Sequence, residues 1–297
     1  MDVSGVPLRD CSPMPLRALR MSASIAPLLR PGASGSVVAT YRRAVDLRLG
    51  GRAVVLVTES LGEQPHGILL PEAVLDGWDV RRGASVHVRP GLLEVAGTLR
   101  LSLPATVWDP RLGPLTPHGG VARIGLAVAA LQAAREAAPA GHGTGAGRAP
   151  WSPVTAAARA LTTGDAALLE RAGAALIGLG TGLTPAGDDV LVGFTAALTA
   201  LGHSRARPIA RAWADAARAR TTTVAETFHL HAAAGEYSGR LHELLRALLA
   251  GPPAAIPDAI HRAATWGATS GWDTLLGVEL GLRCAVAGTA DAGRAAA

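Results

Sequence analysis

The segment Gly178–Asp189 (GLGTGLTPAGDD) holds the residues of this chain best suited to chemistry. Three alternate glycines precede a threonine and a proline, and two adjacent aspartates follow at once. Thr184 suits the N-cap of a helix and Pro185 its first position. Glycine costs a helix about 1 kcal/mol relative to alanine, so helix propensity does not explain Gly187 in the first turn. The pattern predicts that the backbone lacks side chains just before the helix and in its first turn.

Two interpretations of this segment are open. In the first, the glycines let backbone N–H groups approach an anion at the positive end of the helix. Asp188 and Asp189 then hold Mg²⁺, accept N–H bonds from the substrate, or act as general acid and base. In the second, the glycines only form a tight connection and the aspartates complement the helix dipole. Adjacent carboxylates repel each other unless a cation or donor lies between them, which favours the first. Its substrate-binding residues would be Gly180, Gly182, Thr184 and Gly187.

A second copy of the pattern lies near the end of the chain. Gly187–Gly193 and Gly271–Gly277 share G-x-D-x-L-x-G, and both copies follow hydroxyl residues. Asp189 and Asp273 therefore occupy equivalent positions in the first turns of two expected helices. Two such helix starts facing each other would form one site with two opposed carboxylates; alternatively, the second copy is only a Ser-x-x-Asp cap. The substrate-binding residues expected from this copy are Ser270 and Gly271.

Histidines elsewhere are weaker candidates. His66 lies in a Pro-His-Gly turn between expected strands, as either a ligand-facing donor or an ordinary exposed side chain. Glu226 and His229 stand three residues apart on an expected helix and could bind a metal together. Thr223 and Glu226 also form a capping box, which is the favoured interpretation. His231 is expected to point away from His229.

The composition excludes several classes of function. All 28 basic residues are arginine, so a Walker P-loop and any Schiff-base lysine chemistry are ruled out. The net charge is +5, but arginine is spread along the chain and aromatic residues make up only 3%, so we expect no nucleic-acid partner. No apolar run approaches the ~20 residues of a spanning helix, so we expect no membrane partner. Cys11 and Cys284 are expected to be reduced thiols in a cytoplasmic protein.

The elements that must position these residues change near residue 110 from expected strands to expected helices. Short Val- and Leu-rich segments favour a small antiparallel sheet or barrel, at 36–49, 53–58, 67–70, 84–88, 92–95 and 98–103. Helical patterns follow at 121–137, 153–161, 165–177, 185–201, 208–219, 223–234, 239–250, 257–265 and 272–287. We expect an α+β protein with a flexible leader (1–35), a β-rich domain (36–115) and a mainly α-helical domain (116–297) that carries the Gly-rich acidic motif and a mobile loop at 138–150.

At these residues the chain resembles the AllH-like family. The likeness covers roughly residues 35 to 285 and is carried by Gly178–Gly193, Ser36–Leu49, Leu61–Leu70 and Gly267–Leu282. Glu226 departs from it, since the family pattern leads us to expect a small hydroxyl residue there. The resemblance implies a subunit of oxamate carbamoyltransferase, an enzyme of allantoin and purine breakdown that needs other subunits. That enzyme uses phosphate to cleave oxalurate into oxamate and carbamoyl phosphate.

The implied reaction suits the expected site. Gly180, Gly182 and the helix start would hold phosphate or the carboxylate of the small anionic substrate. Asp188, Asp189 and Asp273 would be the catalytic residues, accepting the ureido hydrogens or holding Mg²⁺ against phosphate. Two alternatives are open: a non-catalytic subunit that binds a small anionic metabolite and stabilises the assembly, and an Mg²⁺-dependent phosphate or nucleotide enzyme of other specificity.

Overall fold

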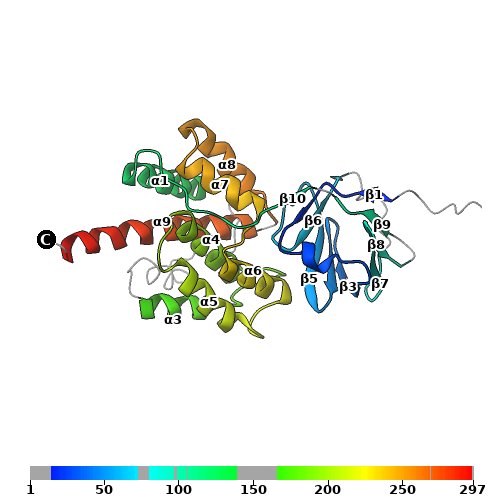
Figure 1. Cartoon of the computed structure of the whole chain (residues 1–297). Helices are drawn as coiled ribbons and strands as arrows, with labels where there is room; N and C mark the ends of the chain where they lie inside the picture. The colour runs from blue at the N-terminus through cyan, green and yellow to red at the C-terminus, as the bar shows by residue number, and fades with distance from the viewer. Residues whose placement is uncertain are drawn as a thin grey trace, which may run out of the picture. The chain divides into compact units, whose positions relative to one another are not determined.

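A computed structural model describes residues 15–72, 80–96, 99–104, 106–138, 166–267 and 269–295 (Figure 1). The chain divides into a β unit, Met1–Ser60 with His66–Trp108, and a helical unit, Leu61–Pro65 with Asp109–Ala297. The expected α+β class is confirmed. The expected helix at 153–161 and, beyond residue 138, the expected loop at 138–150 lie outside the described residues.

One sheet of ten strands forms the described part of the β unit. Its strand order is β1-β9-β8-β7-β3-β4-β5-β6-β2-β10. In β4, alternate apolar residues are buried, as a strand with one core-facing side requires. The strands are β1 (Leu16–Arg17), β2 (Arg20–Ser22), β3 (Ser34–Thr40), β4 (Ala44–Leu49), β5 (Arg52–Thr58), β6 (Gly67–Leu70), β7 (Ser85–Arg89), β8 (Leu92–Val95), β9 (Leu99–Ser102) and β10 (Val107–Trp108).

The sheet curls so far that its two ends approach each other. β1 and β2 are separated by two residues in the sequence, yet β1 begins the strand order and β2 is next to its end. The N–H of Ala18 bonds the Ser102 carbonyl in β9, and the N–H of Leu19 bonds the Leu69 carbonyl in β6. Because two residues span at most about 7 Å, the curl visible in Figure 1 is nearly that of a closed barrel.

The strands correct three expectations. The sheet is not purely antiparallel, because β5–β6, β1–β9 and β10–β2 pair in parallel. The sheet begins within the expected leader, since β1, β2 and the start of β3 precede residue 36. The expected segment 36–49 is two strands, β3 and β4, paired antiparallel. Two- and three-residue strands such as β1 and β2 are too short to show an alternating pattern, so they form only where longer strands offer them free edges.

Eight helices form the described part of the helical unit. None of them is long and apolar enough to cross a membrane. Their apolar faces enclose two clusters of buried side chains, and α4 contributes to both. The helices are α1 (Val121–Ala137), α3 (Ala166–Leu176), α4 (Ala186–Ala200), α5 (Ala206–Ala217), α6 (Thr223–Ala234), α7 (Gly239–Leu249), α8 (Ile256–Ala264) and α9 (Ser270–Ala295).

A buried arginine ties α1 to the end of α7. The guanidinium of Arg123 donates to the carbonyls of Leu248 at 2.5 Å, Ala247 at 2.6 Å and Gly251 at 2.7 Å. The Ala247 and Leu248 carbonyls belong to the last turn of α7, where a helix has no backbone donors left to satisfy them, and Gly251 lies two residues beyond its end. Arg123 therefore acts as a C-terminal cap supplied by another helix.

Replacing Arg123 with alanine should lower the free energy of unfolding by about 3 kcal/mol, because it strands buried carbonyls and removes a packed side chain. Urea denaturation of the purified chain measures the change. The matched control is Arg111→Ala, which removes an exposed arginine paired with exposed Asp109 and should cost no more than about 1 kcal/mol. Equal losses in the two variants would contradict the capping role.

Candidate functional site

Helices α4 and α9 pack with their backbones in direct contact. A Cβ atom on Gly193 would lie less than 3.0 Å from the Thr274 carbonyl oxygen, and one on Gly277 would lie as close to the Val190 carbonyl oxygen. Real Cβ atoms essentially never approach so closely, so both positions require glycine. The sequence repeat aligns Val190 with Thr274 and Gly193 with Gly277, so exchanging the two copies turns one contact into the other. The two helices are therefore related by an approximate two-fold axis.

This packing brings the first turns of α4 and α9 together. The hydroxyl groups of Thr184 and Ser270 lie 2.8 Å apart, and both are hydrogen-bonded to the carboxyl group of Asp189. Asp273 lies close enough for its carboxyl group to perturb the pKa of Asp189. The expected meeting of the two helix starts is present in the structure. We call Thr184, Asp189, Ser270 and Asp273 the α4–α9 carboxyl site.

Asp189 is the most perturbed group of this site. The residue is partly exposed, but its Oδ2 atom is buried and has no hydrogen-bond partner in the described part of the chain. Burial raises the pKa of Asp189 well above its usual range, the Asp273 and Asp188 carboxylates raise it further, and the hydrogen bonds from Ser270 and Thr184 oppose the shift. Neighbouring carboxyl groups with little access to water cannot all ionise. Asp189 therefore keeps its proton at a pH where surface aspartates have lost theirs.

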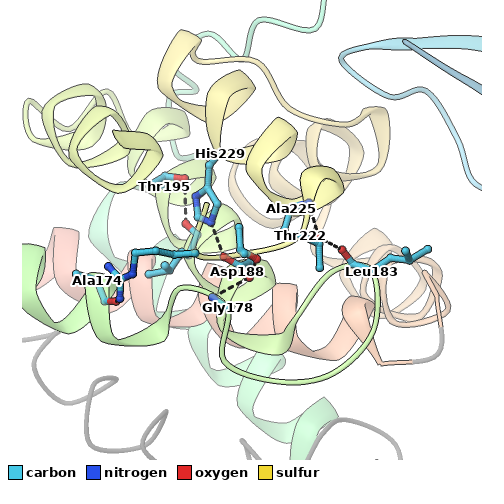
Figure 2. Close-up of polar contacts among 11 residues, drawn as sticks. Ala174, Gly178, Leu183, Asp188, Thr195, Thr222, Ala225 and His229 are labelled. Atoms are coloured by element: carbon cyan, nitrogen blue, oxygen red, sulfur yellow. Dashed lines mark hydrogen bonds and ion pairs between the residues drawn. The ribbon is translucent and has the colours of Figure 1, made fainter. Parts of the chain in front are cut away.

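Figure 2 shows that Asp188 is bonded to Gly178 and to His229 on α6. Its Oδ2 accepts the Gly178 N–H at 3.1 Å and the Thr221 hydroxyl at 2.7 Å. Its Oδ1 lies 2.8 Å from Nε2 of His229 on α6, and the side chains of both residues are 2% exposed. Because successive residues of an α-helix project about 100° apart, the two adjacent aspartates face different surroundings. Asp188 therefore links α4, α6 and the segment 178–183, which we call the glycine loop.

The residues after α5 contact both the glycine loop and the helix before it. The Thr222 hydroxyl donates to the Leu183 carbonyl of the loop. The Arg220 guanidinium donates to the carbonyl of Ala174 in α3 at 2.8 Å. Figure 2 shows the loop running from Gly178, past Asp188, to Leu183 beside the start of α6. The conformation of the loop therefore depends on residues more than thirty positions away in the sequence.

The helix caps differ from those expected by one residue. Pro185, not Thr184, precedes α4 as its N-cap, and the Thr184 hydroxyl is used across the helix pair instead. Thr222, not Thr223, caps α6 by accepting the Ala225 N–H at 3.1 Å. The expected box between Thr223 and Glu226 is therefore wrong. Two threonines precede α6 and a third is its first residue, so the sequence alone does not show which of the three is the cap.

Two of the expected substrate-binding glycines serve packing instead. The N–H of Gly187 bonds the Leu179 carbonyl at 2.9 Å, and that of Gly271 bonds the Trp266 carbonyl at 2.8 Å, so neither N–H is available to a ligand. A Cβ atom at either position would collide with a backbone carbonyl, of Leu176 or of Ala263. This close approach, rather than a ligand, explains the glycine in each first turn.

Gly180 and Gly182 remain candidates. Both are exposed and both have positive φ angles, 122° and 96°, that favour glycine. A Cβ atom on Gly182 would have nothing within 4 Å, so the space beside this residue is open. The two glycines lie two and four residues before Thr184, in a stretch, 180–183, that is exposed throughout.

The histidine candidates have other partners. His66 lies in the β unit, where it is buried and its carbonyl accepts the Val55 N–H; the expectation of an ordinary exposed histidine is wrong. His229 pairs with Asp188 rather than with Glu226. His231 lies 2.6 Å from Glu236 and so has a different partner from His229, as expected. No sequence pattern connects positions 188 and 229, which is why the pair escaped prediction.

The expected Mg²⁺ ligands do not fit together. No group of three or more His, Cys, Asp or Glu side chains that could hold a metal ion occurs among the described residues. Both oxygens of Asp188 are already engaged by protein groups. Mg²⁺ requires a nearly octahedral set of oxygen ligands, and Asp188 cannot join one without giving up these bonds.

Comparison with known families gives one match, in the helical unit. Residues 176–282 match the model of the AllH family. The family is described as oxamate carbamoyltransferase subunit AllH. The match runs from the last residue of α3 into α9 and so includes the whole α4–α9 carboxyl site. The earlier stretches that resemble the family lie outside the AllH match. No curated protein and no solved structure matches this chain.

Proposed function

We propose that this chain is a subunit of an oxamate carbamoyltransferase of allantoin and purine breakdown, and that the α4–α9 carboxyl site takes part in its reaction. One observation carries the proposal. Two copies of a sequence repeat, both inside the AllH match, lie side by side at the starts of α4 and α9. Each copy contributes one aspartate and the hydroxyl residue before it to the same site. Such convergence of a perturbed acid with polar partners is typical of reaction sites.

The reaction needs what this site offers. Phosphate attacks the ureido carbonyl carbon of oxalurate, the bond from that carbon to the inner nitrogen breaks, and oxamate leaves. The products are carbamoyl phosphate and oxamate, and the proton lost by hydrogen phosphate reappears on the departing nitrogen. Attack creates a tetrahedral oxyanion, which backbone N–H groups stabilise well. The exposed N–H groups at Gly180 and Gly182 are our candidates for holding phosphate, the substrate carboxylate or this oxyanion.

The decisive experiment is an assay of the chain together with the other subunits of the enzyme. Oxalurate and phosphate are supplied, and carbamoyl phosphate is measured as ATP formed from ADP by an added carbamate kinase. We expect phosphate-dependent turnover by the complex, and none when this chain is left out. We also expect phosphate or oxamate to raise the thermal midpoint of the chain, because ligands that bind only the folded state stabilise it. Turnover that is independent of this chain would reject the proposal.

The word "subunit" in the family description supports a second candidate, a non-catalytic chain that binds the metabolite and stabilises the assembly. The same assay separates the two. If substitutions in the α4–α9 carboxyl site leave turnover by the full complex unchanged, the second candidate is correct.

A further inference from the structure

Resting on the proposed function, we infer that the carboxyl group of Asp189 is the acid that protonates the departing nitrogen of oxamate. Amide nitrogen is a poor leaving group unless it gains a proton as the carbon–nitrogen bond breaks. A general acid suited to this step must carry a proton at neutral pH and lie beside the polar groups that bind the substrate. Asp189 meets both requirements by its surroundings.

The two hydroxyl groups beside Asp189 cannot fully stabilise a negative charge on it. Those of Thr184 and Ser270 lie 2.8 Å apart, and as donors to the carboxyl group they lower the pKa of Asp189 against the larger effect of burial. A hydroxyl group donates only one hydrogen. When one of the two hydroxyl groups donates to the other, a single donor is left for the carboxyl group of Asp189.

The charged groups around Asp189 act in the same direction. Asp273 faces it from α9, and Asp188 adjoins it on α4. The carboxyl group of Asp188 also has a partner of its own, the ring of His229 on α6. Both carboxyl neighbours disfavour a negative charge on Asp189, and burial raises its pKa as well.

The position of Asp189 suits proton transfer to a ligand. Its Oδ2 is buried and has no hydrogen-bond partner in the described residues. A buried polar atom normally has such a partner, and a ligand that reached the site would supply it. The residue itself is partly exposed, and the neighbouring loop at Gly180–Leu183 is exposed throughout. Asp189 gives its proton to the nitrogen as the bond breaks, and the attacking hydrogen phosphate returns a proton to the carboxylate, so each turnover leaves Asp189 protonated.

The test compares Asp189→Asn with Asp215→Asn, which makes the same change at an exposed aspartate of α5. Asparagine keeps the shape and neutrality of the protonated acid but cannot give up a proton. In the complex with the other subunits, Asp189→Asn should lower kcat about 10³-fold, within the usual range for a lost general acid, and change KM only a few-fold. Asp215→Asn should match the wild type.

A second readout is independent of activity. Infrared difference spectra of the chain at pH 7 should show the carbonyl stretch of a protonated carboxyl group, absent in Asp189→Asn and kept in Asp215→Asn. If that band is missing in the wild type or survives in Asp189→Asn, the inference is wrong. Near-normal kcat of Asp189→Asn in an active complex would also overturn it while leaving the proposed function intact. A wild-type complex without turnover would instead reject the proposed function, and with it this role.

Discussion

Replacing Asp188 with alanine should lower the free energy of unfolding by about 3–5 kcal/mol, because each of the polar groups that loses its acceptor costs about 1–3 kcal/mol. The substitution leaves three groups without their acceptor: the partly buried N–H of Gly178, the partly buried hydroxyl of Thr221 and the buried ring of His229. Each stranded polar group carries its own desolvation penalty. Urea denaturation followed by circular dichroism measures the loss.

Two controls identify the source of that loss. Thr221→Val removes a single hydrogen bond of the same cluster and should cost about 1 kcal/mol. Asp215→Ala removes an exposed aspartate and should change stability by no more than about 0.5 kcal/mol. A loss in Asp188→Ala as small as in Asp215→Ala would show that Asp188 is not a buried link, and its predicted role as a metal ligand or catalytic group would regain support.

The second large effect is expected at Gly277. Alanine is the better helix former by about 1 kcal/mol, so on helix propensity alone Gly277→Ala should stabilise α9. The structure predicts the opposite, because the added Cβ would collide with the Val190 carbonyl oxygen of α4. The two helices would have to separate, and overpacking of this kind costs about 1–3 kcal/mol or more. After the gain of about 1 kcal/mol from helix propensity is subtracted, we expect a net loss of up to about 2 kcal/mol in urea denaturation.

The matched control for this variant is Gly125→Ala in α1. Gly125 is exposed, and a Cβ there would have nothing within 4 Å, so the same substitution should stabilise the chain by about 0.5–1 kcal/mol. The repeat also predicts that Gly193→Ala loses about as much as Gly277→Ala, since the two glycines are equivalent under exchange of the copies. Stabilisation in Gly277→Ala would disprove the backbone contact between α4 and α9.

The separation of roles within one acidic pair is the main consequence for function. Asp188 is tied to the loop and to α6, whereas Asp189 faces α9 and retains an unpartnered oxygen. The pair Asp188-Asp189 therefore does not act as two equivalent ligands. Loss of Asp188 should disturb the site by displacing the start of α4, while loss of Asp189 should remove chemistry without displacing it.

The sequence by itself determined the change from a β-rich part to a helical part and the places of most helices, because short alternating patterns and 3.6-residue periodicity are local signals. It also determined that Asp189 and Asp273 are equivalent, since a repeat is visible in one dimension. Nearly all the helices in the described residues lie within about two positions of those expected; α9, which extends well beyond its expected end, is an exception.

Only the tertiary structure decided what each of these residues touches. The pairing of Asp188 with His229 joins positions 41 apart in the chain, and the packing reason for Gly187 is the carbonyl of Leu176 at the end of another helix. The short strands β1 and β2 exist because the edges of a curled sheet accept them. Such contacts depend on how helices and strands pack, and packing depends on the volumes and backbone distances of many residues at once, which no local pattern records.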